Sequence, residues 1–187
     1  NYSFSLDFWQ AYRDLMSPDM SLRSFIDYHY MGLARNVLRY GWIIPYLFGA
    51  SASVCKSFMK DYHEHDLEEF DDNTFYLPYA TSLRMGDIGY QNSQEEEKGV
   101  KANYNSLHNY VHSLRAAMQT SCKDFEEIGL KKDGEYQQLN TNILQIANEY
   151  YASVRPKPLL HGMDRPLRAL TNNGIGYIEI RSLDVNP

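Results

Sequence analysis

Residues Gly174–Pro187 read GIGYIEIRSLDVNP, and this stretch predicts a strand whose two faces differ in chemistry. Side chains alternate across a strand, so Ile178 and Ile180 share one face while Glu179 and Arg181 share the other. We expect the isoleucine face to lie against a hydrophobic core. The opposite face is either a solvated surface with a weak ion pair or the polar wall of an active site.

The composition is that of a globular chain of one domain or slightly more, with 187 residues, 43% of them hydrophobic and 22% charged. The formal net charge is −6 and no basic cluster is present, which argues against a nucleic-acid partner. Local arginines can still bind a small anion. The 16 tyrosines suit interfaces that are part core and part polar cleft.

The cysteines and the apolar stretches bear on location. Cys55 and Cys122 show no metal-ligand spacing, so we expect two free thiols in a cytoplasmic protein, with a single disulfide as the alternative. No signal peptide opens the sequence, and the longest apolar stretch, GWIIPYLFGA, is too short to cross a membrane. Both ends read as if cut through structure, so we expect a piece of a longer protein.

The first half of the chain is predicted to be mainly helical. Residues 2–6 alternate and predict a short strand, and a helix follows over 7–16. The strongest helical signal covers 17–49, with Ser17 as N-cap, a kink or break at Pro45 and an end at Gly49. Its apolar residues at near-helical spacing are Phe25, Tyr28, Met31, Leu33, Val37 and Leu38. Residues 60–73 predict an acidic surface loop, and 74–99 predict an ordered loop with an acidic, flexible tip.

The second half contains shorter elements. Helices are predicted over 102–120, 122–129 and 164–173, with a turn at Asp133–Gly134 and an extended segment before Pro156. The first of these helices carries an apolar face made of Leu107, Tyr110, Val111, Leu114 and Met118. With the closing strand, the chain is predicted to be helix-rich α+β with few strands.

Two pairs of histidines have spacings that metal sites use. His63 and His65 would share a face on a strand, but their acidic stretch predicts a solvated loop. His108 and His112 share a helix face but lack the glutamate of an H-E-x-x-H site, so we interpret them as surface or core-edge residues.

Polar residues in tyrosine-rich stretches are the remaining candidates for chemistry. They are Arg84, Tyr90, Tyr151, Arg155, Glu179 and Arg181. Each alone is explained by a structural role. Together they suit an amino-acid substrate, because arginine holds a carboxylate with two parallel hydrogen bonds, and a carboxylate holds a hard divalent cation.

Four stretches resemble the proteobacterial glutamate–cysteine ligase family: GWIIPYLFGAS, YLPYATSLRMGDIGY, LQIANEYYASVRPK and GYIEIRSLDVNP. The resemblance runs from about Tyr2 to Pro187 and weakens around 62–72 and 91–99. It implies that residues 1–187 are part of that family's catalytic domain. The implied fold is a helix-rich α+β fragment of the glutamine synthetase/glutamate–cysteine ligase-like fold, with a few antiparallel strands forming a funnel.

The resemblance implies an ATP-dependent ligase that joins the γ-carboxylate of glutamate to the amine of cysteine, the first step of glutathione biosynthesis. ATP phosphorylates the carboxylate, the amine attacks the acyl phosphate, and Mg²⁺ (or Mn²⁺) neutralises the phosphates. The implied partners are glutamate, cysteine and ATP, without nucleic acid or membrane.

The family's functional residues map onto matching positions. Glu179 matches a metal-ligating glutamate, and Arg181 matches the catalytic arginine that faces the transferred phosphate. Arg84, Tyr90 and Tyr151 match residues that line the cysteine site.

The match is incomplete. Asn1 falls where the family has a metal-ligating histidine, and Arg155 and Lys157 lie in a matching stretch without an assigned role. The family is longer on both sides, and its N-terminal region supplies most of the acidic metal ligands. We therefore expect the fragment itself to be inactive. The alternatives are a truncated interaction module, or a related carboxylate–amine ligase with another amine acceptor.

Overall fold

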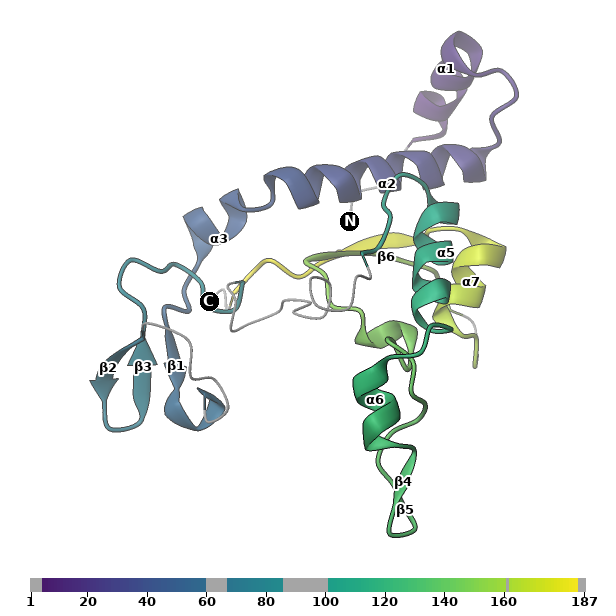
Figure 1. Cartoon of the computed structure of the whole chain (residues 1–187). Coiled ribbons are helices and arrows are strands. Elements are labelled where there is room, and N and C mark those ends of the chain that lie inside the picture. The colour runs from purple at the N-terminus through teal and green to yellow at the C-terminus, as the bar shows by residue number, and fades with distance from the viewer. Residues whose placement is uncertain (1–4, 60–66, 86–100, 161, 185–187) are drawn as a thin grey trace.

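The computed structural model describes residues 5–59, 67–85, 101–160 and 162–184, and Figure 1 shows helices combined with small antiparallel sheets. The helices are α1 (Leu6–Met16), α2 (Leu22–Tyr40), α3 (Ile43–Phe48), α5 (Leu107–Ala117), α6 (Lys123–Ile128) and α7 (Pro166–Asn173). The strands are β1 (Ser53–Cys55), β2 (Glu68–Asp71), β3 (Thr74–Tyr76), β4 (Lys131–Lys132), β5 (Glu135–Tyr136), β6 (Val154–Lys157) and β7 (Tyr177–Ile180). Short 3₁₀ helices cover Lys56–Met59 and Ala147–Glu149. The α+β prediction is confirmed.

Two helix starts differ from the prediction. The Ser5 side chain caps α1 by accepting a bond from the Phe8 N–H at 3.1 Å, so Leu6 is helical and the predicted strand over 2–6 is wrong at its described end. Ser21, and not Ser17, caps α2, accepting from the Ser24 N–H at 3.1 Å. The Ser17 N–H bonds to the Arg13 carbonyl and closes α1, which leaves Ser17 unable to open the next helix.

The long helical signal breaks earlier than predicted. Gly41 and Trp42 separate α2 from α3, whereas Pro45 lies in the first turn of α3, where its missing N–H costs no intrahelical bond. Gly49 ends α3, as predicted. None of the helices in the described ranges is long and apolar enough to cross a membrane.

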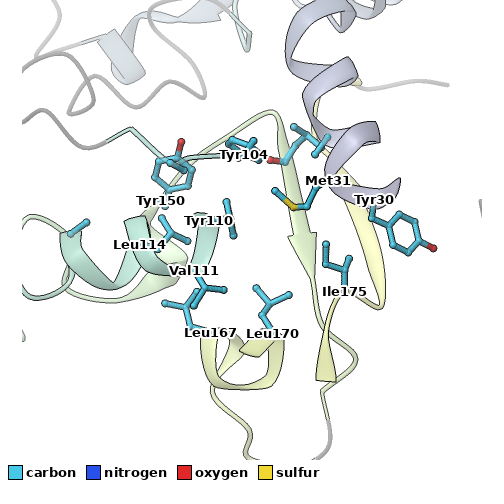
Figure 2. Packing of buried hydrophobic residues seen from close by; sticks show 14 of the residues in the cluster. Tyr30, Met31, Tyr104, Tyr110, Val111, Leu114, Tyr150, Leu167, Leu170 and Ile175 are labelled. Atoms are coloured by element: carbon cyan, nitrogen blue, oxygen red, sulfur yellow. Dashed lines mark hydrogen bonds between the residues drawn. The ribbon is translucent and has the colours of Figure 1, made fainter. Parts of the chain in front are cut away.

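The main core lies where α2, α5, α7 and the β6–β7 ribbon meet (Figures 1 and 2). The predicted face of α5 is confirmed, because Tyr110, Val111 and Leu114 are buried and Leu107 and Met118 pack against the cluster. The α2 face is partly wrong. Its buried residues are Phe25, Tyr30, Met31 and Ala34, whereas Tyr28 and Leu38 are exposed.

A second, smaller core lies under the β1–β3–β2 sheet. Buried Met59 and Leu83 form its centre, with Phe75 packed against them. The acidic stretch predicted as a loop over 60–73 contains strand β2, which pairs with β3. The Tyr76 hydroxyl donates to Glu68 at 2.5 Å, so an acidic strand is held by its cross-strand neighbours.

Strands β6 and β7 form an antiparallel ribbon that lies against α2. Their register places Arg155 opposite Glu179 and Pro156 opposite Ile178. On the inner face Val154 is fully buried and Ile178 packs against the main core. Ile180 is 42% exposed, so the predicted isoleucine face is buried at one position of the two.

Candidate functional site

One face of the β6–β7 ribbon, opposite Val154 and Ile178, gathers charged side chains from both strands. Alternation places Arg155 and Lys157 of β6 on the same face as Glu179 of β7 and Arg181, the residue after β7. Three cations therefore surround one carboxylate. Such a face is predisposed to bind an anion with two or more negative charges.

Glu179 bridges two of these cations. Nη2 of Arg181 donates to both Glu179 oxygens at 3.2 Å, and Nζ of Lys157 lies 3.3 Å from Oε2. Burial raises the pKa of Glu179, but the hydrogen bond from Arg181 and the charge of Lys157 outweigh it, so the pKa is lowered overall. The carboxylate is held ionised and oriented. Within the described ranges the other guanidinium N–H groups of Arg181 make no hydrogen bond.

Arg155 is the most buried member of the group, at 5% exposure. Its Nη2 donates to the Ala147 carbonyl at 3.0 Å, while its Nε has no hydrogen-bond partner among the described atoms. Burial raises the pKa of Tyr110, and the charge of Arg155 and its hydrogen bond oppose that rise. Burial also lowers the pKa of Lys157, and the charge of Arg155 lowers it further. The single negative charge of Glu179 thus does not neutralise the three positive charges of Arg155, Lys157 and Arg181.

The end of β7 is anchored to two other parts of the chain. The Arg181 N–H bonds to the Ser153 carbonyl at 2.8 Å, which brings Arg181 beside the segment that contains Tyr151. Nη1 of Arg84 donates to the Leu183 carbonyl at 2.5 Å. Arg84 therefore contacts the chain just beyond the strand that carries Glu179 and Arg181, and Tyr151 lies two residues from Ser153, which bonds to that strand's end.

Asp184 fixes this exit. It is 7% exposed and accepts bonds from the Ala50 N–H at 2.9 Å, the Ser51 hydroxyl at 2.8 Å and the Ser82 hydroxyl at 2.9 Å. Burial raises the pKa of Asp184, and these three bonds outweigh it, so the pKa is lowered overall. One carboxylate thus ties β7 to the loops on either side of the β1–β3–β2 sheet.

Of the five site residues assigned from the resemblance, Glu179 and Arg181 contact each other, and Arg84 contacts the Leu183 carbonyl beyond the end of β7. Tyr151 lies two residues before Ser153, whose carbonyl accepts from the Arg181 N–H. Tyr90 lies outside the described residues, as do Asn1, His63 and His65. His108 and His112 are exposed on α5, away from the ribbon, as surface residues. Cys55 and Cys122 are free thiols.

Sequence reasoning named Arg155 as a candidate but assigned no role to it or to Lys157, and it missed Asp184. Arg155 and Lys157 are two residues apart in VRPK, a spacing that places both on one strand face, but their partner strand follows from the register alone. Asp184 carried no signal beyond lying in the matching stretch. Its role depends on Ser51 and Ser82, which are more than a hundred residues away.

The described residues do not make a divalent-cation site by themselves. Magnesium requires several oxygen ligands, and the described ranges contain no group of three or more histidine, cysteine, aspartate or glutamate residues that could hold a metal. Glu179 is the single carboxylate of the ribbon face, and two cations already contact it.

Comparisons with known proteins give a consistent result. The family model described as glutamate–cysteine ligase matches residues 1–187. Similar curated relatives include the glutamate–cysteine ligases of Baumannia cicadellinicola and Pseudomonas paraeruginosa, which are 49% and 46% identical over 189 residues. Each match covers 100% of this chain and 35% of the relative, so the chain spans about a third of the length of these relatives.

Solved structures agree with this result. A crystal structure of glutamate–cysteine ligase from Francisella tularensis in complex with AMP matches with a TM-score of 0.80 and 36% identity, covering 99% of this chain and 35% of that one. A bifunctional glutathione synthetase from Pasteurella multocida matches with a TM-score of 0.56 and 26% identity, covering 98% of this chain and 19% of that one.

Proposed function

This chain belongs to the glutamate–cysteine ligase family, and from that premise we propose that its full-length protein joins the glutamate γ-carboxylate to the cysteine amine at the expense of ATP. This reaction is the first step of glutathione biosynthesis. The observation that carries the proposal is that Glu179 and Arg181 of the family-like closing strand share a face with Arg155 and Lys157. The AMP complex of the Francisella relative supports the use of a nucleotide.

The cations of the ribbon face suit the charge that develops in this reaction. A carboxylate is a poor electrophile and must first be phosphorylated. In that step the anionic phosphate of ATP approaches the anionic carboxylate. Arg181 would hold the transferred phosphate through the N–H groups that Glu179 leaves unused, with Lys157 as a second positive charge. When the amine attacks the acyl phosphate, the C–O bond breaks and phosphate leaves with one carboxylate oxygen. The same cations stabilise that leaving group.

We propose that Arg84, Tyr90 and Tyr151 bind cysteine. A guanidinium binds the amino-acid carboxylate with parallel hydrogen bonds, and tyrosine hydroxyls complete a polar pocket. The bond from Arg84 to the Leu183 carbonyl supports this assignment, because it keeps the arginine beside the strand that handles the phosphate.

Glu179 is also proposed as a ligand of Mg²⁺ or Mn²⁺ in the full-length protein. The described residues alone do not fit a metal, so we propose that the further oxygen ligands come from outside the described ranges. We attribute no reaction step of this chain to the metal. The free thiols of Cys55 and Cys122 support a cytoplasmic location for the protein.

The test uses the full-length protein with ATP, Mg²⁺ and glutamate labelled with ¹⁸O in its γ-carboxylate. With cysteine as acceptor, we expect γ-glutamylcysteine and one labelled oxygen in each phosphate released. Unlabelled phosphate would exclude the acyl phosphate. Repeating the assay with 2-aminobutyrate tests the acceptor site, and faster turnover with that analogue than with cysteine would favour a related ligase of different specificity.

A further inference from the structure

A cavity of about 290 Å³ lies between α2, α5 and α7, apart from the β6–β7 face. Its floor is apolar and includes buried Val111 and Leu170. Polar side chains stand around this floor: Arg23, Asp27, His108, His112, Arg115 and Thr171. The cavity thus combines a small apolar base with a charged rim, the arrangement that small-molecule sites commonly have.

The α5 side of the rim is a stripe of basic residues. His108, His112 and Arg115 are spaced four and three residues apart, so they share one face of the helix. The two imidazole rings lie 6.3 Å apart with an angle of 25° between their planes. Both rings line the cavity, and their solvent exposure leaves them accessible to a ligand.

The guanidinium of Arg115 is oriented by α7. Its Nη2 donates to the Thr171 hydroxyl at 2.8 Å, and within the described ranges its remaining N–H groups make no hydrogen bond. A second cavity, of about 1250 Å³, also has Arg115 in its wall, so this side chain lies between two open spaces. Arg115 is therefore a preoriented donor that a ligand can reach.

The α2 side of the rim is already neutralised. Arg23 donates to the carbonyls of Thr171 and Asn172 at the end of α7, which covers the negative end of that helix. Asp27 accepts from the Ile175 N–H at 2.7 Å and lies 3.8 Å from Nε of Arg23. The two arginines exceed the one carboxylate, so the cavity has an excess of positive charge even with neutral histidines.

We propose that this cavity binds a small oxyanion of the phosphate or sulfate type, held by Arg115, His108 and His112. The apolar floor allows the oxyanion to carry a short carbon chain. This site is separate from the proposed ligase site and does not depend on the ligase function.

The imidazoles of His108 and His112 can donate hydrogen bonds to an oxyanion beside the Arg115 guanidinium. The other charged groups that face the cavity are Arg23 and Asp27 of α2. Burial raises the pKa of Asp27, and its bond from Ile175 and the charge of Arg23 oppose that rise.

The experiment is a calorimetric titration of the full-length protein with sulfate, whose charge is constant between pH 6 and pH 8. A saturating, non-hydrolysable ATP analogue occupies the nucleotide site throughout. We expect sulfate to bind saturably. Arg115→Gln should weaken it roughly tenfold or more, because a charge-assisted hydrogen bond is lost. His112→Asn should also weaken it, because the imidazole is lost from the cavity wall.

The control is Lys132→Gln, which removes an exposed charge from the β4–β5 hairpin and should leave sulfate binding unchanged. Acetate, titrated in parallel, distinguishes a site for tetrahedral dianions from one for carboxylates. Circular dichroism confirms that each variant is folded. Sulfate binding that is absent, or that is equally tight in the parent and in the folded Arg115→Gln and His112→Asn variants, would overturn the proposal.

Discussion

Glu179 is a carboxylate surrounded by positively charged neighbours. Lys157 and Arg181 both contact it, and Arg155 lies directly across the ribbon. A fully exposed ion pair is worth at most about 1 kcal/mol. Here both partners are largely covered, with side-chain exposures of 32% for Glu179 and 24% for Arg181. The pair is therefore shielded from solvent more than an exposed surface ion pair is.

Replacing Glu179 by Gln in the full-length protein keeps the size of the side chain and removes its charge, and Arg181→Lys keeps the charge and loses the two-pronged donor. We expect both variants to lose most of kcat while circular dichroism remains unchanged. Raised Mg²⁺ should partly restore Glu179→Gln and leave Arg181→Lys unaffected. A folded Glu179→Gln enzyme with near parental turnover at low Mg²⁺ would show that Glu179 and Arg181 form a surface ion pair without a catalytic role.

Lys157 gives a pH dependence with a defined sign. Burial, followed by the charge of Arg155, lowers its pKa below the ordinary value of 10.5, so it loses its charge at a lower pH than an exposed lysine does. If its ammonium group binds phosphate, affinity for an ATP analogue should weaken as the pH rises from 8 to 10. Lys157→Arg should flatten that curve, because arginine stays charged. Equal curves for the two proteins would remove Lys157 from the phosphate site.

Arg84 tests the cysteine site. Arg84→Ala removes a charge-assisted hydrogen bond, which is worth about 1.5–3 kcal/mol. In the full-length enzyme we expect the KM for cysteine to rise roughly tenfold or more, with a smaller change for ATP. Steady-state kinetics with each substrate varied in turn make the measurement. A raised KM for ATP at an unchanged KM for cysteine would assign Arg84 to the nucleotide.

At the level of elements, the closing ribbon is placed by the end of α7. Gly174 has φ of 77° and accepts no side chain in that conformation, and its position puts the Ile175 N–H on Asp27 of α2. A Cβ at Gly174 would lie 2.8 Å from Oδ1 of Asp27. The turn into β7 is therefore fixed by both backbone conformation and space.

A matched pair of substitutions separates those two effects. Gly134 in the β4–β5 turn has φ of 88°, and a Cβ there would meet no atom within 4 Å. In the full-length protein, Gly134→Ala should cost about 1 to 3 kcal/mol from its dihedral angles alone. Gly174→Ala should lower the apparent melting temperature further, because it also displaces Asp27. Equal shifts in melting temperature, measured by differential scanning fluorimetry, would show that the contact with Asp27 does not affect stability.

Local signals predicted the elements better than they predicted the site. The α5 face, the turn at Asp133–Gly134 and the closing strand follow from spacing and turn chemistry. The cap of α2 was assigned to Ser17 because a proline follows it, but that serine ends the preceding helix. The pairing of Arg155 with Glu179 depends on strand register across the ribbon, which no local pattern specifies.

At the level of the molecule, the segment after β7 links the two cores. Asp184 accepts bonds from Ser51 and Ser82, and the Leu183 carbonyl accepts a bond from Arg84, so the chain leaving the β6–β7 ribbon is held to the loops beside the β1–β3–β2 sheet. Large apolar side chains remain exposed along and beside α3: Trp42, Ile43, Tyr46, Leu47 and Phe48. An apolar surface of this kind normally lies against other protein.

The chain by itself should therefore not make γ-glutamylcysteine. Phosphoryl transfer depends on charge neutralisation that is in place before the reaction, and the described residues offer Glu179 without further acidic ligands. Incubation of the 187-residue chain with glutamate, cysteine, ATP and Mg²⁺ should release no ADP above background, whereas the full-length protein should turn over under the same conditions. A cooperative thermal transition in circular dichroism would show that the inactive chain is folded. Turnover of the chain at a rate comparable to the full-length enzyme would mean that residues 1–187 hold a complete active site, and that the acidic ligands assigned to the remaining two-thirds are not required.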